Sequence, residues 1–102
     1  MSVVGFVQTL CIGANHPALP GHFPGQPLVP GVILLEQVAL ALRAWRGQRL
    51  SQVFEAKFVA PLRPNETALL RLSETAANGT RIRFEIERDG ILLARGVVEG
   101  AT

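Results

Sequence analysis

The feature that most constrains this chain is the stretch Gly21–Leu42, in which a loop rich in proline and glycine runs directly into an apolar segment. Prolines at positions 24, 27 and 30 fix φ, and the glycines reach backbone conformations that other residues avoid, so we expect a rigid, shaped loop. Pro30 suits the start of a helix, where its missing N–H costs nothing, and good helix formers follow it. The sequence therefore predicts a helix from about Gly31 to Trp45 or Arg46.

This predicted helix is apolar around most of its circumference, because only Glu36 and Gln37 are polar between Val32 and Leu42. A helix of that kind is expected to be buried. Glu36 is then a carboxylate within the core, which is costly unless the group has a partner or a purpose. The alternative interpretation is a side chain that reaches the surface or is satisfied by a hydrogen bond.

The rest of the chain has the two-residue period of β-strands. An initial strand is predicted within Met1–Asn15, and apolar and polar residues alternate at 54–58, 70–73 and 82–87, with a last strand at 91–99. Asn78-Gly79 and Asp89-Gly90 predict tight turns, so the C-terminal strands are antiparallel. One helix and one antiparallel sheet must cover each other, which predicts an α+β fold with the sheet wrapped around the helix. Because so few strands cannot enclose a helix, we expect two chains to pair.

Length and composition exclude several classes of protein. A chain of 102 residues is predicted to form one domain, 1–102. One cysteine, Cys11, cannot form an internal disulfide and fits a reducing cytoplasm. No secretory signal is recognised, and the apolar run is shorter than the roughly 20 residues that span a membrane. The net charge of +2 is mild, and neither a nucleic-acid patch nor a phosphate-binding glycine loop is found.

Two residues have side chains suited to proton transfer, His22 and Glu36. An imidazole titrates near neutral pH, and a carboxyl group can be tuned by its surroundings. A loop histidine that caps a backbone carbonyl is the alternative interpretation of His22, but the pair and the shaped loop between them together favour an active site. A metal site built from these two residues with Cys11 and His16 is disfavoured by the irregular spacing.

The surrounding residues resemble the signature of the β-hydroxyacyl-(acyl carrier protein) dehydratases of the hotdog fold. That signature is His-Phe-Pro-Gly-x-Pro-x-x-Pro-Gly-Val followed by an acidic residue, and it is matched by His22-Phe23-Pro24-Gly25-Gln26-Pro27, Pro30-Gly31-Val32 and Glu36. A weaker match covers Ala56–Pro64. The segment Pro64-Asn65-Glu66 stands where the family has Pro-Gly-Asp, and Leu40 stands where many members have glutamine. The short N-terminus and His16–Pro20 are more similar to the small dehydratases of aryl polyene pigment pathways.

The resemblance implies a dimer whose active sites lie at the interface between chains. His22 would remove the C2 proton of a 3-hydroxyacyl thioester, and Glu36 of the partner subunit would help the C3 hydroxyl group to leave as water. The backbone N–H of Gly31 would donate to the thioester carbonyl, at a helix N-terminus where free N–H groups gather. No cofactor and no metal are implied.

The resemblance also guides the choice of lining and docking residues. An apolar channel for the acyl chain is expected from Phe23, Pro30, Val32 and Leu35, with Leu40 narrowing it or keeping it dry. Trp45 is expected to pack at the helix end. Basic residues near the helix end and on the next strand form either a solvated face or a docking site for an acidic acyl carrier protein; they are Arg43, Arg46, Arg49, Lys57 and Arg63.

The sequence thus predicts dehydration of 3-hydroxyacyl-(acyl carrier protein) to the trans-2-enoyl product in fatty-acid or aryl polyene type synthesis. Two alternatives stay open. A hotdog thioesterase would use an acid and water on the same class of substrate. A non-catalytic subunit would stabilise an active homologue in a heterodimer; the presence of both His22 and Glu36 argues against this, whereas Leu40 leaves it open.

Overall fold

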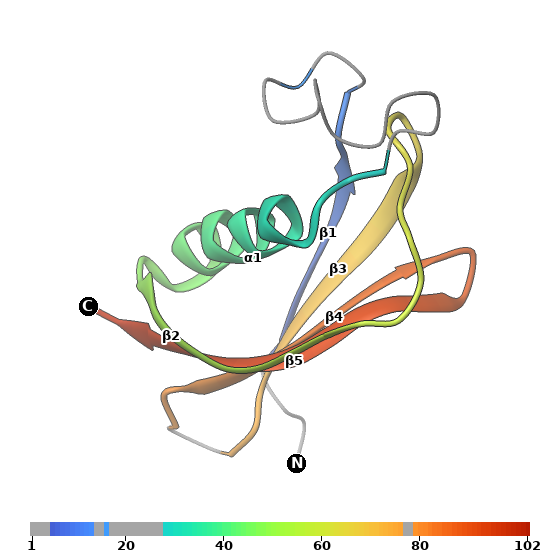
Figure 1. Cartoon of the computed structure of the whole chain (residues 1–102). Coiled ribbons are helices and arrows are strands. Elements are labelled where there is room, and N and C mark those ends of the chain that lie inside the picture. The colour runs from blue at the N-terminus through green and yellow to red at the C-terminus, as the bar shows by residue number, and fades with distance from the viewer. Residues whose placement is uncertain (1–4, 14–15, 17–27, 77–78) are drawn as a thin grey trace.

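The computed structural model describes residues 5–13, 16, 28–76 and 79–102, and its elements follow the predicted order β-α-β-β-β-β (Figure 1). The strands form one antiparallel sheet in the order β1-β3-β4-β5-β2. The α+β prediction is confirmed. The elements are β1 (Gly5–Cys11), α1 (Gly31–Arg46), β2 (Arg49–Phe58), β3 (Thr67–Glu74), β4 (Arg81–Arg88) and β5 (Ile91–Ala101).

The helix lies across the concave face of the curved sheet, as Figure 1 shows. Its buried residues recur at helical spacing and face the strands; they are Ile33, Leu34, Val38, Ala41 and Leu42. On β4, buried apolar residues alternate with exposed charged ones, which places Ile82, Phe84 and Ile86 on the helix side. The core therefore lies between one face of α1 and one face of the sheet.

Gly96 allows a large ring to lie inside this core. It stands opposite Phe84 on β4 and Ala56 on β2. A Cβ atom on Gly96 would lie 2.5 Å from Cε2 of Phe84, and it would also collide with the carbonyl oxygen of Glu55. A side chain at this position would therefore displace the Phe84 ring or the neighbouring strand.

Local turn and cap signals are confirmed where the structure describes them. Asp89 and Gly90 have φ values of 52° and 80°, as a tight hairpin turn requires. Gly47 ends α1 in the left-handed conformation, and its N–H donates to the carbonyl of Arg43 at 2.8 Å. Asn65 also has a left-handed φ of 68°, at the position where the related motif has glycine. Asn78 lies outside the described residues.

The expected burial of the helix holds for only one face of α1 within the single chain. Val32, Glu36 and Leu40 recur every four residues along the side of α1 that the sheet does not cover, and we call them the outer stripe. Val32 is 70% exposed and Leu40 is 55% exposed. Glu36 is likewise exposed and is not a core carboxylate within this chain.

The end of α1 is fastened to the sheet by aromatic and charged contacts. The ring of Trp45 stacks on that of Phe6 on β1, with centroids 6.2 Å apart, which confirms its predicted packing role. The guanidinium of Arg46 lies 4.2 Å from the centre of the Trp45 ring and pairs with the carboxylate of Glu74 at 2.5 Å. Its Nη1 also donates to the carbonyl of Gly79 at 3.5 Å. No helix in the described part of the chain is long and apolar enough to cross a membrane.

The core assignment predicts unequal effects for two isoleucines on neighbouring strands. Ile82 is fully buried, whereas Ile91 is 54% exposed. We expect Ile82→Ala to lower the free energy of unfolding by about 2–5 kcal/mol, because it leaves a cavity, and Ile91→Ala by less than about 1 kcal/mol. Urea unfolding followed by circular dichroism measures both. Equal losses would contradict the placement of the core.

A second pair of variants tests the fastening of the helix end. Arg46→Met should lower the free energy of unfolding by about 1–2 kcal/mol, because Glu74 is left half-buried without its cation. Arg43→Met, one turn earlier and exposed, should change it by no more than about 0.5 kcal/mol. The same urea titration distinguishes the two. A loss in Arg43→Met that matches the loss in Arg46→Met would contradict the assigned contact.

Candidate active site

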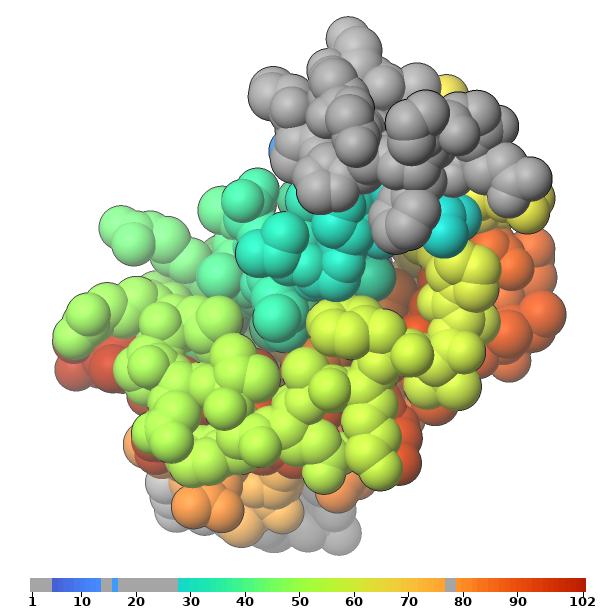
Figure 2. All heavy atoms as spheres, viewed as in Figure 1, coloured from blue at the N-terminus to red at the C-terminus, as the bar shows by residue number. Residues whose placement is uncertain are grey.

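A groove of about 300 Å³ opens at the N-terminus of α1. Figure 2 shows the start of the helix beside the segment that follows β2. No residue that lines the groove has a polar side chain; the lining residues are Leu28, Val29, Pro30, Gly31, Leu34, Phe58, Val59, Ala60, Pro61 and Leu62. Such a groove suits an apolar ligand that carries a few polar atoms.

Backbone hydrogen bonds hold the two walls of the groove together. The N–H of Val29 donates to the carbonyl of Leu62 at 2.8 Å, which ties the segment before the helix to the segment after β2. The second segment is fixed to the sheet in turn, because the N–H groups of Val59 and Ala60 both donate to the carbonyl of Leu93, at 2.7 and 3.2 Å. The start of the helix therefore has a defined place relative to β5.

Gly31, the first residue of α1, lines this groove. Pro30 is the N-cap, with φ −62° and ψ 148°, and its carbonyl accepts from Ile33 and Leu34 at 3.0 and 3.4 Å. The N–H groups of Gly31 and Val32 precede the first helical hydrogen bond. No side chain caps them within the described residues, and the first turn has no acidic residue. The positive end of the helix can therefore bind a partly negative oxygen.

Gly31 also shapes the groove sterically. A Cβ atom at this position would lie 2.8 Å from Cζ of Phe58. Because glycine has no side chain, the Phe58 ring can pack against the helix backbone and close one side of the groove. Phe58 is half exposed, so its ring forms an apolar surface beside the N–H groups of the first turn.

The predicted site residues fall into four sets. Pro30 and Gly31 line the groove, whereas Val32, Glu36 and Leu40 lie on the outer stripe and do not line the groove of their own chain; Leu35 is half-buried against the core. His22 and Phe23 lie outside the described residues. The structure thus describes the Gly31 and Glu36 positions but not the predicted His22–Glu36 pair.

The predicted docking residues do not form one cluster. Arg43 and Arg46 lie in the last turn of α1, about 18 and 22 Å along the helix axis from Gly31 at 1.5 Å per residue, and Arg49 begins β2 just beyond it. Arg46 is occupied by Glu74 and Trp45. Lys57 and Arg63 are exposed near the groove, the first preceding Phe58 and the second following Leu62.

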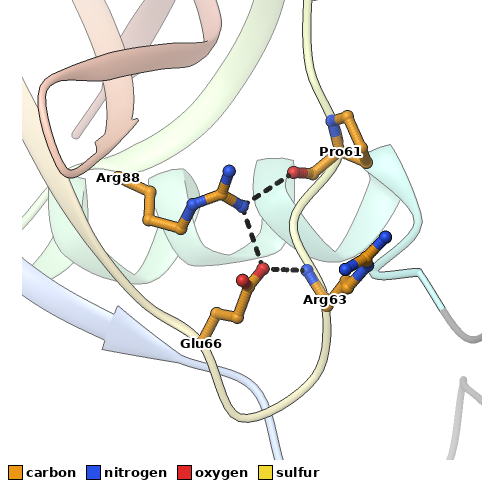
Figure 3. Close-up of polar contacts among 4 residues, drawn as sticks. All are labelled: Pro61, Arg63, Glu66 and Arg88. Atoms are coloured by element: carbon orange, nitrogen blue, oxygen red, sulfur yellow. Dashed lines mark hydrogen bonds and ion pairs between the residues drawn. The ribbon is translucent and has the colours of Figure 1, made fainter.

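Sequence reasoning missed a polar network behind the groove wall, shown in Figure 3. Arg88 donates from Nη1 to the carbonyl of Pro61 at 3.2 Å and to Oε1 of Glu66 at 2.9 Å. The same Oε1 accepts the backbone N–H of Arg63 at 2.8 Å. This N–H and the nearby Arg88 guanidinium lower the pKa of Glu66 below its ordinary value. The motif Pro64-Asn65-Glu66 marks the turn in the sequence, but no local pattern identifies Arg88 as its partner.

Other titratable residues do not gather into a metal site. Among the residues that the structure describes, no three histidine, cysteine, aspartate or glutamate side chains could hold one ion together. Cys11 is exposed at the end of β1. What the groove itself offers is apolar surface and the backbone N–H groups at the helix start, a combination suited to holding an acyl group by its carbonyl oxygen.

Comparison with known proteins identifies the family. A family model described as ApeI-like, ApeI dehydratase, matches residues 5–97. The 3-hydroxyacyl-[acyl-carrier-protein] dehydratase FabZ of Caulobacter sp. (strain K31) is 28% identical over 95 residues, covering 82% of this chain and 56% of that protein. The FabZ of Histophilus somni (strain 2336) is 35% identical over 71 residues, covering 60% and 47%. This chain spans about half the length of the curated relatives it matches.

Solved structures show the same architecture. A chain of the dehydratase heterocomplex ApeI:P from Xenorhabdus doucetiae aligns with a TM-score of 0.82 at 25% identity, covering 96% of this chain and 88% of that one. A mutant of the fluoroacetyl-CoA-specific thioesterase FlK aligns with a TM-score of 0.70 at 14% identity, covering 99% and 87%, a likeness of fold alone. The chain therefore belongs to the ApeI-like dehydratase family, and its fold is the hotdog fold that the sequence predicted.

Proposed function

We propose that this protein dehydrates 3-hydroxyacyl groups on acyl carrier protein to trans-2-enoyl groups, in fatty-acid or aryl polyene type synthesis. One observation carries the proposal: Gly31, at the start of a helix that no side chain caps among the described residues, lines an apolar groove in a chain that belongs to a dehydratase family. A thioester carbonyl gains negative charge when the neighbouring C2 proton is removed. N–H donors at a helix N-terminus stabilise that charge.

In the proposed reaction, His22 takes the C2 proton of the substrate, and the freed electron pair becomes the C2–C3 double bond. The C3–O bond breaks, and Glu36 of the partner subunit gives its proton to the departing hydroxyl group, which leaves as water. Solvent then returns the proton from His22 to Glu36. Gly31 donates to the thioester oxygen throughout, and the reaction as written balances without a cofactor.

A second hotdog chain completes the proposed site. Strand β2 is at the edge of the sheet, and Val53, Phe54 and Phe58 on it are all partly exposed. The outer stripe of α1 is apolar on either side of Glu36. We propose that two chains pair along β2, which covers the stripe and brings each Glu36 toward the groove of the other chain. The partner is a second copy or a related subunit, and the ApeI:P heterocomplex supports pairing of this general kind.

The proposed docking surface for the carrier protein is smaller than the sequence predicted. Lys57 and Arg63 are exposed beside the groove and are proposed to attract the acidic carrier. Arg43 and Arg49 lie at the far end of the helix and belong to this surface only if a second chain brings them near its own groove. Arg46 is excluded because its guanidinium is already paired.

A non-catalytic subunit remains the second candidate function because of one observation. Leu40 is exposed one turn after Glu36, where many dehydratases have glutamine. An apolar side chain there cannot hold a water molecule or orient the carboxylate by hydrogen bonding. If this chain only supports an active partner, its own Glu36 is dispensable.

The first test follows loss of water from 3-hydroxyacyl-(acyl carrier protein) by mass spectrometry. We expect His22→Ala and Glu36→Gln each to lower turnover about 100-fold or more, because each removes a proton-transfer group. Glu85→Gln is the matched control, since Glu85 is exposed on β4 and does not line the groove. It should retain the activity of the unmodified protein.

Three results would contradict the dehydratase assignment. Unchanged turnover in both site variants would remove His22 and Glu36 from the mechanism. Release of free carrier thiol, measured with a thiol reagent, would favour the thioesterase. Activity that appears only with a related hotdog partner and survives Glu36→Gln would favour the non-catalytic subunit.

The second test concerns pairing along β2. Val53→Lys should raise the dissociation constant of the dimer at least about tenfold, because lysine on an edge strand opposes pairing with another strand. Val7→Lys is the control, because Val7 lies on the opposite edge strand; the two valines are 39% and 55% exposed. Sedimentation analysis measures both. Equal dissociation constants for the two variants would place the interface elsewhere.

A further inference from the structure

We propose that Arg88 and Glu66 are positioning residues, which hold the wall of the groove and thereby the first N–H groups of α1. The inference rests on the proposed function, because it assigns these residues a role in the same site. Neither residue lines the groove. They act through the segment Pro61–Leu62, which does.

The network is centred on Nη1 of Arg88 and Oε1 of Glu66, and Figure 3 shows them beside the loop that carries Pro61 and Arg63. Nη1 of Arg88, at the end of β4, donates to the carbonyl of Pro61 at 3.2 Å and to the carboxylate of Glu66 at 2.9 Å. That carboxylate accepts the N–H of Arg63 at 2.8 Å. The Arg88 and Glu66 side chains are half-buried, so the contact is only partly open to water.

The carbonyl of Pro61 is well suited to be an anchor point. Proline has no N–H, so its backbone is fixed by a hydrogen bond only through the carbonyl. The next carbonyl, that of Leu62, accepts the N–H of Val29 at 2.8 Å. The carbonyls of Pro61 and Leu62 therefore hold this part of the groove wall at two points. The first carbonyl is bound by Arg88 of β4, and the second by Val29, which precedes α1.

The hydrogen bond of Val29 also connects the groove wall to the N–H group that is proposed to bind the thioester oxygen. Val29 is followed by the N-cap Pro30 and then by Gly31, whose N–H is the proposed donor. A shift of the wall would therefore move the start of the helix relative to Phe58, which packs on Gly31. Donors to a developing oxyanion must lie about 2.7–3.1 Å from it, and a misplacement of about 1 Å can cost 100-fold in rate.

The carboxylate of Glu66 stays ionised at neutral pH. The N–H of Arg63 and the guanidinium of Arg88 both favour the ionised carboxylate of Glu66 and lower its pKa. Interactions with this carboxylate are therefore present above the ordinary titration range of a glutamate and are lost only as the pH falls through the lowered value. The carboxylate therefore stays available to the Arg63 N–H and the Arg88 guanidinium at neutral pH.

Kinetics of four variants of the full chain test the proposal. Arg88→Met should lower kcat about tenfold or more and change KM by less than about threefold, because the affected donors act mainly on the transition state. Arg88→Lys should recover most of the rate, since one ammonium has donors for both acceptors. Glu66→Gln should lie between them. The matched control is Arg71→Met. It breaks the ion pair between Arg71 and Glu87, whose N–O distance is 2.9 Å and which does not line the groove, and it should leave kcat unchanged.

Amide hydrogen exchange provides a readout that does not depend on activity. In Arg88→Met the N–H of Val29 should exchange faster than in the unmodified protein, and in Arg71→Met it should not. If Arg88→Met does not fold, Arg88→Lys and Glu66→Gln decide by the same two measurements. Equal kcat and equal exchange at Val29 in Arg88→Met and Arg71→Met would overturn the proposal.

The two proposals can fail separately. If the unmodified protein does not dehydrate hydroxyacyl substrates, the proposed function fails, and exchange at Val29 alone then decides whether Arg88 positions the wall. If the protein is active but kcat and the exchange at Val29 are the same in Arg88→Met and Arg71→Met, only the positioning role fails.

Discussion

The structure depends on the burial of one face of α1 against one face of a curved sheet. Ile33, Val38 and Leu42 occupy that face and are almost completely removed from water. A sheet of five strands covers only one side of a helix, so the outer stripe is left open. The same constraint leaves β2 as an exposed edge beside the helix. A single chain of this kind therefore has apolar surface and an unpaired strand edge on the same side, which favours assembly.

Two glycines show how backbone and aromatic rings share limited space in this fold. Gly96 admits the ring of Phe84 into the core, and Gly31 admits the ring of Phe58 against the start of the helix. The consequences differ because Phe84 is buried and Phe58 is half exposed. The first contact stabilises the fold, whereas the second shapes the groove.

Sequence alone predicted what is encoded locally. The helix bounds follow from Pro30 and Gly47, and the hairpin at Asp89 follows from its dipeptide. Strand β2 begins earlier than the predicted 54–58, because register shifts between Leu50 and Gln52 and between Val53 and Glu55 interrupt its alternation. The contact between Arg88 and Glu66 joins residues 22 positions apart, and no local pattern signals it. The sequence left the exposure of Glu36 open, because periodicity does not say whether a helix is covered by its own chain or by another.

Whether Glu36 is covered by its own chain or by a second one matters for the chemistry that its carboxylate can carry out. In the single chain the carboxylate of Glu36 faces solvent between Val32 and Leu40, and no element of its own chain brings it to the groove. Water around a carboxylate screens its interaction with a reacting group, and exclusion of that water strengthens the interaction. A second chain that covers Val32 and Leu40 would exclude water from both sides of Glu36. The apolar neighbours of this carboxylate would therefore strengthen its interactions only once a second chain covers them, because Val32 and Leu40 are both exposed in the single chain.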